Sequence, residues 1–265
     1  MTLRIGRIAY TNLFPIFYAL ENEADCSSYE FIDGVPSDLN RRLHNGDIDI
    51  SPSSSIEYLK HRDQYTLVTG HSISSFGRVG SVLLFSKRPI EALDGMTILT
   101  SSQSETSVAL LAIILRKFLG ITCFLKSTRE PLDEVLRSHD ACLIIGDDAI
   151  KEALRRPELL MYDLGDLWYR HTGMPMVFAL WIMRNSSLEH KPNLLRQFML
   201  DLDQSKKSAL GNYAKIAKHS WLKQVISPAE IVSYWEGISY DLGEEHRKGL
   251  ELFSRYAEEL GLIHD

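Results

Sequence analysis

The sequence IDISPSSS at residues 48–55 runs from a short apolar strand into a cluster of small hydroxyl residues that begins a helix. The sequence MTILTSSQSETS at residues 96–107 has the same order of features. Amides at a helix N-terminus carry partial positive charge, and Ser or Thr side chains there add hydroxyl donors. Each cluster by itself is typical of ordinary helix capping. Two clusters at matching places in two strand–helix units favour a site that binds a small dicarboxylate.

The candidate site residues all lie next to predicted strands. Asn12 follows the first strand, at the carboxyl end where open α/β sheets bind ligands, but it is an equally good cap for the next helix. Ser81 begins a strand after a glycine, and it faces either a ligand or solvent. Gly146 and Asp147 follow an apolar strand, although an acidic residue is also a normal first-turn choice of a helix. The predicted hydroxyl ligands of the anion are Ser53, Ser54 and Ser55 in one cluster and Ser102, Ser104, Thr106 and Ser107 in the other.

The composition is that of a globular protein and is compatible with a small anion as a ligand. The chain has 265 residues, 45% of them hydrophobic, which is enough for one large or two moderate domains. A net charge of −6 without a basic stripe argues against nucleic acid as a partner. Cys26, Cys123 and Cys142 lack paired spacing, and the nine histidines are scattered, so we expect reduced thiols, no metal and no cofactor.

The N-terminus and the hydropathy predict a cytoplasmic protein with no membrane partner. Residues 1–8 enter a strand at once, without the basic and apolar segments of a secretion signal. The best apolar run, at residues 176–183, has the length of a strand and not of a membrane-spanning helix.

Strands alternate with helices over the first part of the chain, which is typical of an α/β fold. The predicted strands of a first unit lie at residues 3–9, 29–33, 48–50, 66–69 and 80–85, and its helices lie at residues 13–20, 37–43 and 54–60. A second unit has strands near residues 96, 122 and 141, with helices at residues 106–119, 131–137 and 147–154.

Beyond residue 187 the pattern predicts helices alone, at residues 193–210, 212–218, 228–237 and 244–260. We expect these helices to pack around the first unit, so the chain must return to it. Two apolar strands, at residues 79–86 and 176–184, are placed to make this double crossover. The predicted architecture is two α/β lobes joined by two crossover strands, with a C-terminal helical segment and a cleft between the lobes. Lobe 1 takes residues 1–86 and 180–265, and lobe 2 takes residues 87–179.

Common catalytic motifs are missing from the sequence. It contains no G-x-x-x-x-G-K-[ST], no G-x-G-x-x-G, no G-x-S-x-G and no H-E-x-x-H. The usual signals for nucleotide hydrolysis, dinucleotide redox chemistry, serine hydrolysis and zinc hydrolysis are therefore absent.

Six segments together resemble the chorismate dehydratase family. They are IGRIAYTN from residue 5, GVPSDLN from 34, DISPSSSIEY from 49, GSVLLFS from 80, LIIGDDA from 143 and DLGDLWYRHTGMPMVFALW from 163. The resemblance runs over essentially the whole chain. It implies a type II periplasmic-binding-protein-like fold that acts as an enzyme inside the cell.

The same resemblance implies a reaction, the loss of water from chorismate to give 3-[(1-carboxyvinyl)oxy]benzoate in the futalosine route to menaquinone. In the family the enolpyruvyl carboxylate of the substrate is thought to act as the base, assisted by an Asn and a Ser. These residues match Asn12 and Ser81 here. Asn12 would orient the substrate and hydrogen-bond the departing hydroxyl, and Ser81 would position the ring or stabilise charge at its carboxylate.

Other functions remain open at this point. A sister enzyme of the superfamily forms 1,4-dihydroxy-6-naphthoate. It usually has a His-Glu pair where this chain has Gly146 and Asp147. It also has a Pro-Leu-Gly type sequence where this chain has residues 177–181. Both differences favour the dehydratase. A carboxylate receptor without catalytic activity has the same kind of site, whereas a transcriptional effector domain is disfavoured by the lack of a DNA-binding helix pair. A homodimer is compatible with the apolar faces of the C-terminal helices.

Overall fold

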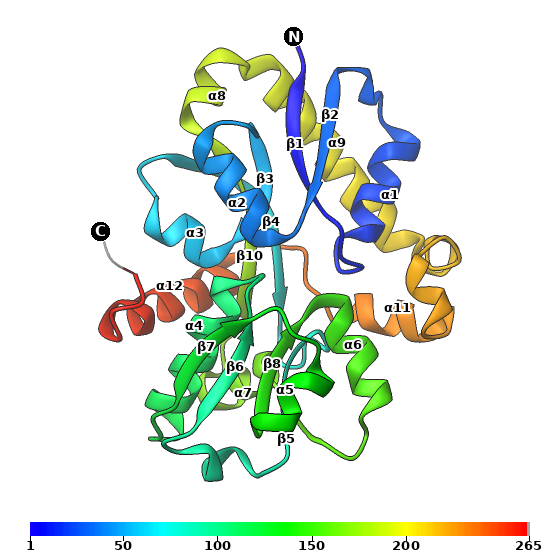
Figure 1. Cartoon of the computed structure of the whole chain (residues 1–265). Helices are drawn as coiled ribbons and strands as arrows, with labels where there is room; N and C mark the ends of the chain where they lie inside the picture. Colours follow the sequence, from blue (N-terminus) through cyan, green and yellow to red (C-terminus); the bar gives the residue numbers. More distant parts are fainter. Residues whose placement is uncertain (264–265) are drawn as a thin grey trace. The chain divides into compact units, whose positions relative to one another are not determined.

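The computed structural model describes residues 1–263, which divide into two compact units (Figure 1). Unit 1 consists of Met1–Ile73 and Ala179–Leu242, and unit 2 consists of Ser74–Phe178 and the chain from Gly243 onward. The chain therefore passes from one unit to the other three times. The predicted α/β class is confirmed, because each unit contains a five-stranded sheet with helices.

The sheet of unit 1 has the strand order β2-β1-β3-β10-β4. Strand β1 (Leu3–Ile8) pairs in parallel with β2 (Tyr29–Gly34) and with β3 (Ile50–Ser54). Strand β10 (Met176–Arg184) runs antiparallel to β3, and β4 (Tyr65–Ser75) completes the sheet. Both β4 and β10 extend past the boundary of unit 1, so they carry two of the three passages of the chain.

The helices of unit 1 bury aromatic side chains against this sheet. Trp181 of β10 is 2% exposed and lies between Phe17 and Phe198, with ring centroids 5.8 and 5.7 Å away. Phe17 belongs to α1 and Phe198 to α9, and these two helices pack against each other. The helices are α1 (Phe14–Glu23), α2 (Pro36–Asn45), α3 (Ser55–Lys60), α8 (Asn185–His190), α9 (Pro192–Gly211), α10 (Tyr213–Ile216) and α11 (Pro228–Glu236), with 3-10 turns at Cys26–Ser28 and Trp221–Gln224.

The sheet of unit 2 has the order β7-β6-β8-β5-β9, formed by β7 (Phe124–Thr128), β6 (Thr97–Ser101), β8 (Ala141–Ile145), β5 (Val82–Ser86) and β9 (Leu160–Asp163). Its helices are α4 (Glu105–Ile113), which continues as a π-helical turn at Ile114–Phe118, α5 (Leu132–Ser138), α6 (Gly146–Arg155), α7 (Leu164–Thr172) and α12 (Glu244–Glu259), with a 3-10 turn at Ile90–Leu93. Trp168 of α7 is fully buried and contacts Phe253 and Tyr256 of α12.

Two segments lie in a different unit from the one that the sequence predicted. Strand β5 pairs antiparallel with both β8 and β9, so residues 82–86 belong to the sheet of unit 2 and are not the outgoing crossover. Helix α12 covers the core around Trp168 and belongs to unit 2, whereas we expected all C-terminal helices in lobe 1. The first passage of the chain lies in β4. Residues 74–86 and the chain from residue 243 onward therefore belong to unit 2, whereas the sequence predicted them to lie in lobe 1.

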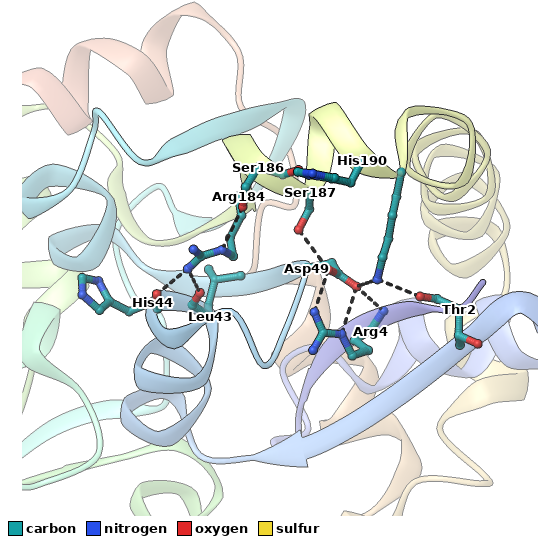
Figure 2. A network of polar contacts seen from close by, with 10 residues as sticks. Thr2, Arg4, Leu43, His44, Asp49, Arg184, Ser186, Ser187 and His190 are labelled. Atoms are coloured by element: carbon teal, nitrogen blue, oxygen red, sulfur yellow. Dashed lines mark hydrogen bonds and ion pairs between the residues drawn. The ribbon is translucent and has the colours of Figure 1, made fainter.

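A buried carboxylate, that of Asp49, holds the N-terminal strand to the helices that follow β10 (Figure 2). Its side chain is 2% exposed. It accepts hydrogen bonds from the backbone N–H of Arg4 at 2.8 Å, from Ser187 Oγ at 2.9 Å and from Lys191 Nζ at 2.6 Å, and the Arg4 guanidinium is 3.0 Å away. Burial by itself raises the pKa of Asp49, but the hydrogen bonds from Arg4, Lys191 and Ser187 lower it to about 2.

We predict that Asp49→Asn destabilises the protein by about 3 kcal/mol at pH 7, because it leaves Arg4 and Lys191 without their shared anion. The folded-state pKa of Asp49 lies below the ordinary value of 3.8, so its contribution is present above pH 3.8 and is lost as the pH falls toward about 2. Urea unfolding, followed by circular dichroism over a pH series, measures both effects. Asp33→Asn is the matched control, because Asp33 pairs with Arg7 but is 59% exposed and should cost below about 1 kcal/mol. Equal losses for the two variants would contradict the role of Asp49.

A second prediction tests the position of α12. A Cβ atom added at Gly249 would lie 2.1 Å from the backbone oxygen of Pro175, so Gly249→Ala should destabilise unit 2 by roughly 1–3 kcal/mol. A Cβ atom added at Gly211, near the end of α9, meets nothing within 4 Å, and Gly211→Ala should leave stability within about 0.5 kcal/mol. Thermal unfolding of the two variants measures this difference. If Gly249→Ala leaves the thermal unfolding unchanged, α12 does not pack closely on the segment before β10.

Candidate functional site

In unit 1 the predicted residue Asn12 lies at the carboxyl edge of the sheet. It occupies the turn between β1 and α1, and its backbone carbonyl accepts a hydrogen bond from Tyr240 Oη at 2.5 Å. The neighbouring carbonyl of Thr11 accepts from Trp235 Nε1 at 2.8 Å. These two aromatic side chains fix the backbone of the turn. Within residues 1–263 the buried Asn12 Oδ1 has no hydrogen-bond partner, so the side-chain amide is available to bind a ligand.

The first serine cluster begins a helix only at its end, and most of it belongs to a strand. Residues 51–54 lie in β3, where Ser53 is opposite Leu180 and Ser54 opposite Ala179 of β10. Ser54 is also the N-cap residue of α3, as the sequence predicted, but its side chain makes no capping hydrogen bond. Ser55 is the first residue of this helix of six residues. A hydroxyl cluster after an apolar run fits a buried strand and a helix start alike, and the antiparallel partner β10 is not visible from the local sequence.

The serines of β3 nevertheless contribute to a polar group at the same edge as Asn12, because β1 and β3 are parallel. Ser54 Oγ accepts a hydrogen bond from Asn40 Nδ2 at 3.0 Å. Ser53 Oγ and Asn40 Oδ1 are buried and, in the part of the chain that the structure describes, have no hydrogen-bond partner. Buried polar atoms without protein partners are rare, and they are accounted for by strain, a bound water or ion, or a ligand. Asn40 was not among the predicted site residues, although it ends the quoted segment GVPSDLN.

In unit 2 the remaining predicted residues lie together at one edge of the sheet. Strands β6 and β8 are parallel, so the residues that follow them, at 102–107 and 146–147, share the carboxyl edge. Strand β5 runs antiparallel to β8 with Val82 opposite Ile145, which places the preceding Ser81 at this edge as well. The backbone N–H of Gly146 donates to the carbonyl of Ser81 at 2.7 Å. Ser81 and Asp147 are buried.

The second hydroxyl cluster does form a helix N-terminus, as the sequence predicted. Ser104 is the N-cap of α4, and its Oγ accepts from the backbone N–H of Ser107 at 3.3 Å. The hydroxyls of Ser104 and Ser107 are 3.0 Å apart, so they also bind each other. Thr106 and Ser107 are buried, and Ser102 lies in the turn before the helix. This cluster offers hydroxyls and the amides of a nine-residue helix to an anion.

Asp163 positions the loop that carries Ser81, a role that the sequence analysis did not assign. Its carboxylate accepts from the backbone N–H of Gly80 at 2.6 Å and from that of Val79 at 3.1 Å. It also caps α7 through the N–H of Gly165 at 2.9 Å. Burial raises the pKa of Asp163 above its ordinary value, while the hydrogen bonds from these amides oppose that shift. The only sequence signal was an acidic residue before a helix, which gives no indication of the distant loop.

The chemistry at both edges is supplied mainly by neutral groups. Amide and hydroxyl side chains from Asn12, Asn40 and the serine clusters can donate to and accept from a polar ligand. Asp147 is the single carboxylate among the predicted site residues, so these residues do not provide the ligand set of a metal centre. This composition suits recognition of carboxylates and hydroxyls better than transfer of a proton by a strong side-chain base.

Solved structures with this fold are periplasmic binding proteins and their relatives. A protein from Archaeoglobus fulgidus matches 99% of this chain and 98% of its own with a TM-score of 0.79 at 20% identity. The alkanesulfonate-binding protein SsuA from Xanthomonas axonopodis pv. citri matches 100% of this chain and 94% of its own with a TM-score of 0.74 at 16% identity. Identities this low establish the fold alone. The predicted periplasmic-binding-protein-like fold is confirmed.

The chain belongs to the family described as Menaquinone biosynthesis, which matches residues 3–259. It is 32% identical to the chorismate dehydratase of Thermus thermophilus over 97% of this chain and 95% of that protein. It is also 30% identical to the chorismate dehydratase of Campylobacter jejuni over 79% of this chain and 80% of that one. The 1,4-dihydroxy-6-naphtoate synthase of Thermus thermophilus is 25% identical over 98% of this chain. The resemblance seen in the sequence motifs is thereby confirmed at the level of the family.

None of the helices within residues 1–263 is both long and apolar enough to span a bilayer.

We predict that Asp163→Ala exposes the loop before Ser81 to exchange with solvent. The substitution removes the acceptor of the partly buried Val79 and Gly80 amides and should cost about 2–3 kcal/mol. Hydrogen exchange measured by mass spectrometry should show faster exchange in the peptide that contains residues 77–81. Asp166→Ala is the control, because it removes a neighbouring acid of the same helix whose carboxylate pairs with Arg170. Unchanged exchange at residues 77–81 in Asp163→Ala would show that the loop is held by other contacts.

Proposed function

We propose that the protein is a hydro-lyase that removes water from chorismate and releases 3-[(1-carboxyvinyl)oxy]benzoate, in menaquinone biosynthesis by the futalosine pathway. Membership of the Menaquinone biosynthesis family and two relatives named chorismate dehydratase support this reaction. The observation that carries the proposal is the set of buried, unpartnered oxygens of Asn12, Asn40 and Ser53 at the edge of the sheet of unit 1. A substrate hydroxyl would supply the missing donor.

The reaction needs little acid or base from the protein. The C–H bond at the ring carbon that bears the enolpyruvyl ether breaks, the C–O bond of the neighbouring hydroxyl breaks, and a ring double bond forms. The proton and hydroxide leave together as water, and the ring becomes aromatic, which supplies the driving force. The protein must orient the substrate, so neutral donors and acceptors at fixed positions are sufficient for most of the task.

In this proposal the catalytic residues are Asn12 and Ser81. Asn12 orients the substrate and hydrogen-bonds the departing hydroxyl through its side-chain amide. Ser81 positions the ring or stabilises charge at the ring carboxylate, with its loop fixed by Asp163. The remaining binding residues are Ser53, Ser54 and Ser55 in unit 1 and Ser102, Ser104, Thr106, Ser107, Gly146 and Asp147 in unit 2. Apart from Asp147, all the residues proposed for recognition of the dianion are neutral.

The roles within the first cluster change from those that the sequence suggested. Ser53 would contact the substrate through its own hydroxyl, because its backbone is part of β3 and does not form a helix N-terminus. Ser54 would act with Asn40, to which it is hydrogen-bonded. The second cluster keeps the predicted role of a helix N-terminus facing a carboxylate. We retain the cytoplasm as the proposed location, as for an enzyme of small-molecule metabolism.

The second candidate function is formation of 1,4-dihydroxy-6-naphthoate, which the relative at 25% identity favours. Gly146 and Asp147 stand where that sister enzyme usually has a His-Glu pair, so this chain lacks the histidine that the sister reaction would need at that position. We therefore rank the dehydratase first. A receptor that binds a carboxylate without turning it over is the alternative that the likeness to SsuA leaves.

We predict that Asn12→Ala and Ser81→Ala each lower kcat/KM for chorismate at least 100-fold, because each removes a group that contacts the reacting ring. The purified protein is incubated with chorismate without added cofactor, and the ultraviolet spectrum is followed for loss of the diene and appearance of a benzoate. Asn22→Ala and Ser138→Ala are the matched controls, because both residues are exposed and lie outside the proposed site. Circular dichroism checks that each variant is folded.

Three outcomes separate the candidates. Turnover by the unaltered chain with near-normal rates in both site variants would discard the assignment of Asn12 and Ser81. Binding of chorismate without any spectral change over hours would indicate a receptor. Failure with chorismate but formation of the naphthoate from its cyclic precursor would identify the sister activity.

A further inference from the structure

A group of metal-binding side chains lies in unit 1 outside the candidate site. His44, Glu57 and His61 each place one donor atom within 4.8 Å of the donor atoms of the other two. The imidazole centroids of His44 and His61 are 4.8 Å apart. His44 lies in the last turn of α2, and Glu57 and His61 come from α3 and its C-cap. None of the three is assigned a role in the proposed reaction.

The arrangement follows from the local fold. Glu57 and His61 are separated by four residues, so a helical backbone places them on the same face one turn apart. The other histidine, His44, comes from the end of α2. Arg184 holds this end, because its Nη1 donates to the carbonyl of Leu43 at 2.6 Å and to that of His44. In Figure 2 the imidazole of His44 points away from Arg184 and from the network of Asp49. This group was not predicted from the sequence, because its members come from two different helices.

The carboxylate of Glu57 is held in place by a hydrogen bond from a neighbouring tyrosine. Tyr65 Oη donates to Glu57 Oε1 at 2.8 Å. An ordinary phenol keeps its proton at neutral pH, so Tyr65 donates this hydrogen bond. Outer hydrogen bonds of this type fix the orientation of a metal ligand and are a regular part of metal sites.

We propose that His44, Glu57 and His61 bind one divalent transition-metal ion of the zinc class. Two imidazole nitrogens and one carboxylate oxygen form a ligand set that zinc commonly takes, with a fourth position for water or another ligand. Magnesium and calcium prefer sites built from oxygen atoms, so the histidines select against them. The single carboxylate leaves the filled site with one net positive charge. The bound ion would tie the end of α2 to α3 and stabilise unit 1.

The test uses the full chain without a histidine tag, freed of metal by chelation and dialysis. Isothermal titration with zinc chloride should give one site per chain, and zinc in excess should raise the midpoint of thermal unfolding by roughly 3–6 °C. Cobalt(II) should give visible absorption bands of a four-coordinate ion. Magnesium at the same concentration should give no binding signal in the titration and should leave the midpoint of thermal unfolding unchanged.

The variants assign the site. His44→Ala, His61→Ala and Glu57→Gln should each weaken zinc binding at least tenfold, and Glu57→Gln keeps an oxygen acceptor for Tyr65. His190→Ala is the control, because it removes an exposed histidine of the same unit and should leave binding unchanged. Zinc binding that persists at full strength in His61→Ala and Glu57→Gln would overturn the proposal, as would equal stabilisation by magnesium. These measurements do not involve chorismate, so they stand or fall separately from the proposed reaction.

Discussion

The buried carboxylate of Asp49 determines how unit 1 is assembled. It lies directly before β3, binds the backbone and side chain of Arg4 in β1, and reaches Ser187 and Lys191 beyond β10. Lys191 Nζ in turn donates to the carbonyl of Thr2 at 2.9 Å. Segments that are almost 190 residues apart in the sequence are thus held by one anion. This contact lies where β1 pairs with β3, and together with the backbone hydrogen bond from Asp49 to Arg4 it supports the register of the two strands that end near Asn12 and Ser53.

In the proposed function the two edges would recognise an anion in different ways. In unit 2 the helix N-terminus at Ser104 supplies aligned amide dipoles and hydroxyls. In unit 1 the strand β3 supplies side chains alone, supported by Asn40. Neither edge relies on lysine or arginine among the predicted residues. A dianion bound by dipoles and hydroxyls alone would not form an ion pair with a cationic side chain of these residues.

The sequence predicted local structure well and long-range pairing less well. The helix after β1 and the passage through β10 could be predicted, because periodicity and strand length are local properties of residues 3–23 and 176–184. That Ser53 lies in a strand could not be predicted, because it depends on antiparallel pairing with Leu180, 127 positions away. For the same reason the sheet to which β5 belongs could not be predicted, because its partners β8 and β9 come later in the chain. The role of Asp163 could not be predicted either, because its carboxylate accepts a hydrogen bond from the distant Gly80. The candidate site residues could be proposed from their positions next to strands, whereas the supporting residues Asn40 and Asp163 required the tertiary contacts.

The placement of α12 has a consequence for how the protein is made. Trp168 is fully buried, and Phe253 and Tyr256 contribute to its cover. Both aromatic residues lie after Leu242, where the last segment of unit 1 ends. During translation unit 1 can therefore complete its core first, while unit 2 keeps an apolar surface open until α12 has been synthesised. A break in the chain between Leu242 and α12 would leave unit 1 complete and unit 2 open to chaperones or proteases.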